Sequence, residues 1–103
     1  MAINPNCGEV ISIDAAKKLI NAFKVKYPNE IQCSFVGIEK VNLILNQEGC
    51  MGIRLYNGYD EDLERFSPVL IGVDAEGNDM TAVIIDRTAP CPPDCDTNSL
   101  LNN

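Results

Sequence analysis

The sequence contains no histidine and no tryptophan, and its aromatic side chains are limited to three phenylalanines and three tyrosines. With so few rings, the core must consist mainly of isoleucine, leucine and valine. Without histidine, Cys50 lacks the base that most often activates a cysteine nucleophile. We therefore expect a protein without enzymatic activity, while acid–base catalysis by a pair of carboxylates stays an open alternative.

Long apolar runs are also missing from the sequence. No stretch approaches the roughly 20 residues of a membrane-spanning helix. The N-terminus lacks the charged start and apolar block of a secretory signal. These features predict a cytoplasmic protein. In such a reducing compartment the five cysteines, an odd number, are expected to be free thiols.

Positive charge is scarce in the second half of the chain. In residues 1–50 five lysines balance five acidic residues, whereas residues 51–103 hold three arginines, ten acidic residues and the whole net charge of −7. Such a chain cannot build a basic face for phosphate groups, which excludes nucleic-acid binding and disfavours membrane surfaces. A protein partner with a basic surface fits better, and self-association is the alternative.

The length of 103 residues predicts one domain, because a chain of this size can bury a core without disulfide support. Residues 11–27 carry apolar side chains at helical spacing, with Ser12 placed to cap the first turn. Residues 38–47 show similar spacing and predict a second helix, although a strand through residues 41–46 is the alternative. A short strand is predicted between the helices, at residues 31–36.

Three further segments have the apolar pattern of strands: residues 50–58, 66–74 and 80–86. The charged residues 59–65 predict a hairpin connection that projects into solvent. The expected order is α-β-α-β-β-β, an α+β fold with both helices packed on one face of a small antiparallel sheet. From Arg87 onward three prolines predict an irregular chain. We thus expect a domain over residues 1–88 and a proline- and cysteine-containing tail over residues 89–103.

Three segments carry a resemblance: NQEGCMGIRLYNG at residues 46–58, PVLIGVDAEGND at residues 68–79 and CPPDC at residues 91–95. In combination they resemble a set of small uncharacterised bacterial proteins with GC-x-GIR, VGVD-x-x-GND and closing CPP-x-C segments. The resemblance covers about the second half of the chain. It implies a bacterial, free-standing domain, and it implies no activity.

Cys91 and Cys95 form the most specific pair, with two prolines between them that preset a turn. Such a turn can bring the sulfur atoms within bonding distance. Three interpretations stay open: a local disulfide or thiol pair, half of a zinc site completed by Cys7, Cys33 or Cys50, and two ordinary thiols. A thioredoxin-like activity is not expected, because the pair does not follow a strand and open a helix. Outside a zinc site, Cys33 and Cys50 are expected to be small buried residues.

Two runs of carboxylates flank the predicted strand at residues 66–74, and their members are Asp60, Glu61, Asp62 and Glu64, then Asp74, Glu76 and Asp79. Clustered oxygens suit calcium. The second run, however, lacks the glycine position and the distal glutamate of an EF-hand. Solvated turns are the simpler interpretation. We expect no cofactor, with zinc and calcium as alternatives.

Arg54 and Tyr56 share the strand face opposite Ile53 and Leu55, and both residue types are favoured at interface hot spots. If no helix covers that face, it is the best candidate for a recognition surface. The acidic loop would extend this surface with Tyr59, Asp60, Glu61 and Asp62. The alternative is that Arg54 pairs with an acid on a solvated face, with Tyr56 packed beside its stem.

The leading hypothesis is a small acidic protein–protein interaction module, such as an inhibitor, an adaptor or an assembly subunit. A second hypothesis is a thiol–disulfide or cysteine–metal module centred on Cys91 and Cys95. A third is a structural subunit that assembles by pairing a strand edge, for which residues 80–87 are suited.

Overall fold

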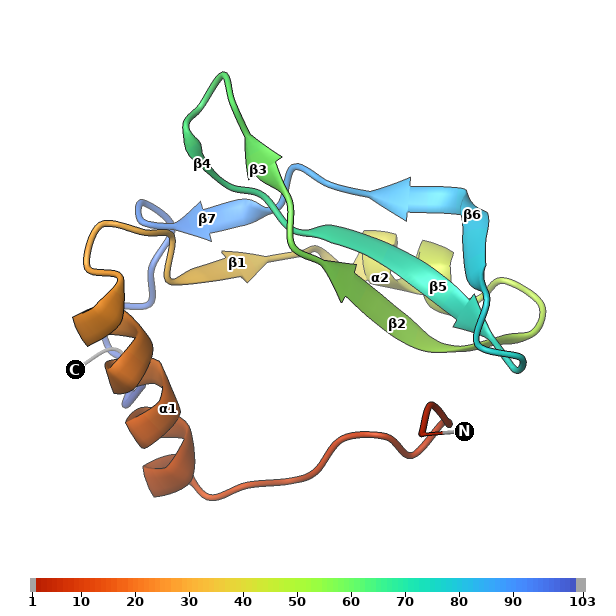
Figure 1. The fold of residues 1–103 in the computed structure, drawn as a ribbon, viewed down its shortest axis with the longest axis horizontal. Helices are drawn as coiled ribbons and strands as arrows, with labels where there is room; N and C mark the ends of the chain where they lie inside the picture. Colours follow the sequence, from red (N-terminus) through yellow and green to blue (C-terminus); the bar gives the residue numbers. More distant parts are fainter. Residues whose placement is uncertain (1, 102–103) are drawn as a thin grey trace.

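The structure is a computed structural model, and it describes residues 2–101. The elements follow one another along this range (Figure 1) as α1 Ile13–Lys26, β1 Cys33–Phe35, α2 Ile38–Leu45, β2 Cys50–Tyr56, β3 Tyr59–Asp60, β4 Arg65–Phe66, β5 Val69–Asp74, β6 Asp79–Ile85 and β7 Ala89–Cys91. The predicted α+β class is confirmed, and the observed order begins α-β-α-β as expected. None of the described helices has the length and apolar content needed to cross a lipid bilayer.

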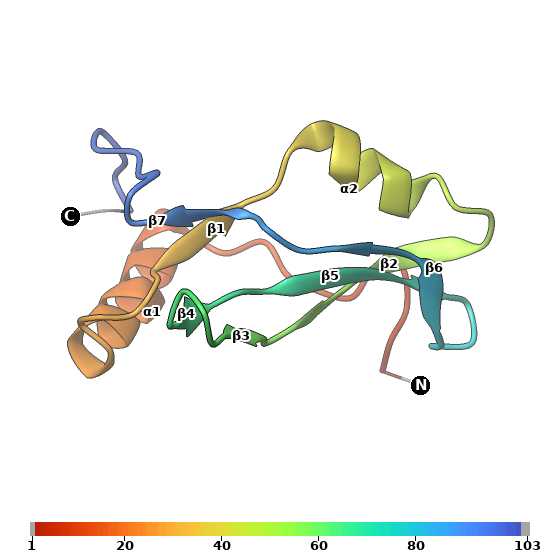
Figure 2. The same ribbon diagram turned by 90° about the horizontal axis from the view of Figure 1, so that it is seen from above.

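The centre of the molecule is an antiparallel sheet in which β5 lies between β2 and β6. β5 supplies most of the buried side chains, among them Leu70, Ile71 and Val73. β5 has a neighbouring strand on each side, and α2 covers one face of the sheet (Figure 2), while the N-terminal residues run along the β2 edge (Figure 1). Ile3 and Pro5 line a hollow there together with Val73.

α2 packs on the sheet through Ile44, which is 0% exposed. Gly72 of β5 faces this helix, and a Cβ atom at that position would lie only 3.3 Å from Cγ2 of Ile44 and 2.8 Å from Nε2 of Gln47. The same Nε2 donates a hydrogen bond of 2.9 Å to the Ile44 carbonyl. The absence of a side chain on Gly72 therefore lets α2 approach the sheet closely.

α1 begins as predicted, because the Ser12 hydroxyl accepts a hydrogen bond of 3.1 Å from the amide of Ala15. Its position differs from the prediction. Figures 1 and 2 show α1 beyond one end of the sheet, beside β1 and β7, while only α2 lies over the sheet face. No residue of α1 is buried. The apolar pattern predicted the helix correctly, but it does not identify the surface on which the helix rests.

The segment after Arg87 is more regular than its prolines suggest. Ala89–Cys91 forms β7, which pairs antiparallel with β1 so that Ser34 lies opposite Pro90. The prediction of an irregular chain from Arg87 onward is therefore wrong for these three residues. A pair of two strands leaves one side of each strand unpaired, and the missing amide of a proline is tolerated there.

The predicted hairpin connection is present at residues 59–66, which we call the acidic hairpin. It contains two short strands, β3 and β4, in which Tyr59 lies opposite Phe66 and Asp60 opposite Arg65. Figure 1 shows this hairpin projecting away from the sheet, on the side of the molecule opposite the N-terminal segment.

Candidate functional site

The sheet face that carries Arg54 and Tyr56 is occupied by an internal network. Arg54 forms an ion pair of 2.5 Å with Asp79, and the hydroxyl of Tyr56 donates a hydrogen bond to the same carboxylate. A second Arg54 nitrogen reaches the carbonyl of Gly77 at 3.4 Å. The structure thus contains the alternative arrangement, in which Arg54 pairs with an acid and Tyr56 lies beside it. These two side chains hold β2 to the start of β6.

The pKa values in this network move away from neutrality. The hydrogen bond from Tyr56, then that from Arg54, lowers the pKa of Asp79 below its ordinary value. The hydrogen bond to Asp79 raises the pKa of Tyr56, and the same carboxylate raises the pKa of Arg54. A general acid or base works best with a pKa near the working pH. The network is therefore suited to fixing charges in place rather than to transferring protons.

The acidic hairpin uses one of its carboxylates for its own turn. Asp60 accepts hydrogen bonds of 3.0 Å from the amides of both Asp62 and Leu63. The other acidic side chains, those of Glu61, Asp62 and Glu64, are exposed. Of the four hairpin residues predicted as partner-binding, Asp60 is thus structural, while Glu61 and Asp62 remain available to a partner.

Apolar side chains accompany the carboxylates on the acidic hairpin. Tyr59 and Phe66 stack edge to face with ring centroids 6.2 Å apart, and both rings are exposed, as is Leu63 in the turn. Exposed aromatic groups rimmed by charges are typical of protein interfaces. The sequence gives no sign of Phe66 as a surface residue, because only the pairing of β3 with β4 brings it beside Tyr59, and Leu63 owes its exposure to its place in the turn between these strands.

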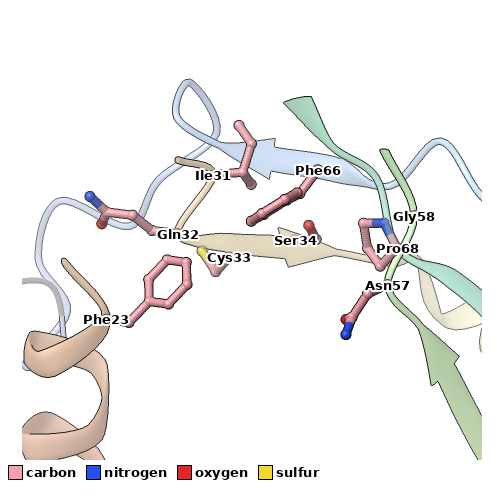
Figure 3. Close-up of a pocket in the computed structure, with 9 residues that line it drawn as sticks. All are labelled: Phe23, Ile31, Gln32, Cys33, Ser34, Asn57, Gly58, Phe66 and Pro68. Atoms are coloured by element: carbon pink, nitrogen blue, oxygen red, sulfur yellow. The ribbon is translucent and has the colours of Figure 1, made fainter. Parts of the chain in front are cut away.

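The base of the acidic hairpin borders a hollow of about 360 Å³, shown in Figure 3. The hollow is lined by Phe23 of α1, Cys33 of β1, Phe66 of the hairpin and Pro68 just after it. The rings of Phe23 and Phe66 approach the hollow from different elements in Figure 3. The hollow is thus a largely apolar gap between α1, β1 and the hairpin.

The second carboxylate run forms a closed turn. Asp74 accepts hydrogen bonds from the amides of Glu76 and Asn78, at 3.0 and 2.9 Å. Asp79 is engaged with Arg54 and Tyr56, as described above. Within residues 2–101, no group of three or more cysteine or acidic side chains is arranged to hold a metal ion. Asp74 and Asp79, two of the three carboxylates of this run, therefore have structural partners.

Cys91 and Cys95 are joined by a disulfide, with their Cα atoms 4.9 Å apart. The turn between them is closed by a hydrogen bond of 2.8 Å from the amide of Asp94 to the carbonyl of Pro90. The free cysteines are Cys7, Cys33 and Cys50.

The expectation that Cys33 is buried is wrong, since this residue is exposed. Cys50 is half-buried, and its Sγ donates to the Gly52 carbonyl at 3.3 Å. Cysteine is usually buried in proteins, so the sequence gives no sign of this exposure. The exposure of Cys33 follows from its place in a two-stranded pair, whose register cannot be seen in the sequence.

Comparison with protein-family models, with curated proteins and with solved structures gave no match. The resemblance to small bacterial proteins stays a prediction. The function must therefore be inferred from the geometry described above.

Proposed function

We propose that the chain is a non-catalytic protein–protein interaction module, and that its acidic hairpin binds a basic protein surface. One observation carries this proposal: the accessible surface is 7804 Å². A compact monomer of 11.3 kDa is expected to expose only about 5,700 Å². The excess, about 2,000 Å², exceeds the roughly 800 Å² that each partner buries in a standard interface.

The excess surface is partly apolar and lies at identifiable places. On the acidic hairpin it includes Tyr59, Leu63 and Phe66. On α1 it includes Leu19, 67% exposed, and Val25, 83% exposed. Surfaces of this kind are usually covered by a partner.

The chain itself offers a small positively charged surface that suits the acidic hairpin, although it holds too few lysines for the extended basic face that nucleic acid requires. We call it the α1 outer face, and it consists of the exposed residues Lys18, Leu19, Ala22, Val25 and Lys26. α1 as a whole carries four lysines and one aspartate. Pairing of two α1 helices would bring like charges together, whereas α1 against the acidic hairpin of a second copy brings opposite charges together. We therefore propose self-association through this contact.

The test is the molar mass of the protein in solution, measured by light scattering over a range of concentrations. The proposal predicts a dimer that dissociates when salt rises from about 0.1 to 1 M, because the screening length falls from about 10 to 3 Å. Glu61→Lys with Asp62→Lys should give a monomer. Glu76→Lys with Asp86→Lys is the matched control, since it makes the same change in net charge at exposed positions outside the hairpin.

The measurement also distinguishes the alternatives. A monomer at every concentration would contradict self-association, and the hairpin would then require a basic partner from another chain. A dimer that resists both salt and the charge reversal would favour pairing of strand edges, for which β6 is placed at one side of its sheet.

The proposed location is the cytoplasm, as expected from the sequence. A disulfide between Cys91 and Cys95 is unusual for a structural bond in that compartment. Cytoplasmic disulfides are usually transient, with catalytic or redox-sensing roles. A reactive Cys91–Cys95 bond would agree with this location, and Cys33 is the free thiol that lies opposite Cys91.

A further inference from the structure

Three of the five cysteines lie together at the β1–β7 pair. Cys33 of β1 is directly opposite Cys91 of β7, and Cys91 is joined to Cys95. Directly opposite residues of antiparallel strands project to the same side, with Cα atoms about 4.5–5.5 Å apart. Disulfides span Cα distances of about 4.4–6.8 Å. The register therefore gives Cys33 and Cys91 the Cα separation that a disulfide between them requires.

The surroundings of these sulfurs agree with the strand register. Cys33 and Cys91 both line one hollow of about 170 Å³, which Ile20 of α1 also lines. Cys91 is 3% exposed, whereas Cys33 is exposed and also borders the hollow near Phe23 and Phe66 (Figure 3). Cys33 is therefore accessible to solvent and also borders the hollow that Cys91 lines. The sulfur of Cys91 is itself shielded from external thiols.

We propose that Cys33, Cys91 and Cys95 form a thiol–disulfide exchange site, in which Cys33 is the internal attacking thiol. The thiolate of Cys33 bonds to Sγ of Cys91, and the Cys91–Cys95 bond breaks. Cys95 leaves as a thiolate and takes up the proton that Cys33 released. One disulfide is lost and one is gained, so the step needs no oxidant or reductant.

The exchange changes which thiol faces the solvent. Cys95 is half-buried next to exposed residues of the C-terminal turn, so its released thiol can attack an external disulfide. That second step forms a mixed disulfide at Cys95 and releases one thiol of the external molecule. Low-molecular-weight disulfides, with oxidised glutathione as the probe, are the proposed ligand class. This inference rests on the β1–β7 geometry and is independent of the acidic hairpin.

The other free cysteines provide matched controls. Cys7 lies in the N-terminal segment and lines a hollow with residues of β2, and Cys50 begins β2. Neither is in the β1–β7 register, so Cys7→Ser and Cys50→Ser should leave the exchange unchanged.

The first experiment maps disulfides in the full-length oxidised protein. The protein is kept at pH 8, quenched with acid, alkylated, digested and analysed by mass spectrometry. We expect a Cys33–Cys91 linkage together with alkylated Cys95, and we expect both to be lost in Cys33→Ser. With oxidised glutathione present, glutathionylated Cys95 should form in the wild type and be lost in the same variant. A Cys91–Cys95 linkage alone, or equal labelling of Cys95 in wild type and Cys33→Ser, would overturn the proposal.

A second variant traps the product of the exchange. In Cys95→Ser, oxidation with a glutathione buffer should join Cys33 to Cys91 as the main linkage. Random pairing of Cys91 with Cys7 or Cys50, or a Cys91 that stays reduced, would contradict the geometry. Cys33→Ser and Cys95→Ser remove different sulfur atoms. If one variant fails to fold, the other still tests the proposal.

Discussion

Asp79 joins two strands through one carboxylate, and this arrangement determines how the stability of the sheet depends on pH. Its pKa is lowered in the folded state, so its contribution is present above the unfolded value of about 4 and is lost as the pH falls further. The pKa of Tyr56 is raised, so its contribution is present below about 10 and is lost as the pH rises through the folded value. The network therefore stabilises the fold between these limits.

Asp79→Asn tests the acidic limit. The variant should melt at a lower temperature at pH 7, and its melting temperature should fall less than that of the wild type when the pH is lowered from about 5 to 2, because the lost carboxylate no longer takes up a proton. Circular dichroism during heating measures both effects. Asp86→Asn, at an exposed position just after β6, is the control and should follow the wild type. Equal pH profiles for Asp79→Asn and wild type would contradict the role given to Asp79.

Gly72 is a second residue with a specific steric role. Gly72→Ala places a methyl group 2.8 Å from Nε2 of Gln47 and 3.2 Å from Sγ of Cys50. Overpacking of this kind lowers the free energy of unfolding by about 1–3 kcal/mol. Each kcal/mol lowers the melting temperature of a small domain by roughly 4–8 °C. Gly52→Ala is the matched control, because nothing lies within 4 Å of the added atom. If both variants melted alike, the close approach of α2 to Gly72 would not limit the packing.

The two helices differ as elements in how they are held. α2 is fixed by Ile44 against β5, whereas α1 has no buried residue and contacts the body through half-buried side chains such as Ile20 and Phe23. Local stability follows the burial of apolar contacts. Amide hydrogen exchange should therefore be faster in α1 than in α2 and β5 at low protein concentration.

Self-association should alter that pattern. If α1 docks on a second copy, its amides should become more protected as the protein concentration rises, while those of β5 should not change. Mass spectrometry of deuterated peptides measures this directly. Slow exchange in α1 at all concentrations would show that the helix is stable without a partner.

Sequence patterns predicted individual helices and strands better than the contacts and the register between them. Periodic apolar residues and the Ser12 cap predicted α1 and α2, and alternation predicted β2, because these signals are local. The Arg54–Asp79 pair joins residues 25 positions apart and depends on the register of β5 with both neighbours. β7 was missed because proline usually argues against a strand.

The same is true of the candidate sites, whose local features could be predicted from the sequence while the contacts between distant segments could not. The spacing of Cys91 and Cys95 admitted a disulfide, but the sequence could not place Cys33 opposite Cys91. The acidic character of residues 59–65 was evident, whereas the stacking of Tyr59 on Phe66 required the hairpin register.

At the scale of the whole molecule, the chain is more open than its length requires. Its radius of gyration is 15.2 Å, compared with about 13 Å expected for 103 residues in a compact domain. Figure 1 shows the cause, since the N-terminal segment and α1 extend away from the sheet. Charge is also unevenly distributed along the chain, because the lysines lie in its first half and the excess of acidic residues lies in its second half. An assembly in which these parts of two copies meet accounts for both features.

The most direct test of the contact between α1 and the acidic hairpin is sedimentation velocity on a mixture of two charge-reversed variants. One carries Lys18→Glu and Lys26→Glu on the α1 outer face, and the other carries Glu61→Lys and Asp62→Lys on the acidic hairpin. We expect each to sediment alone as a monomer, and an equimolar mixture to form a heterodimer, because opposite charges meet again at both contacts. Two monomers in the mixture, under conditions in which the wild type is a dimer, would contradict the proposed contact.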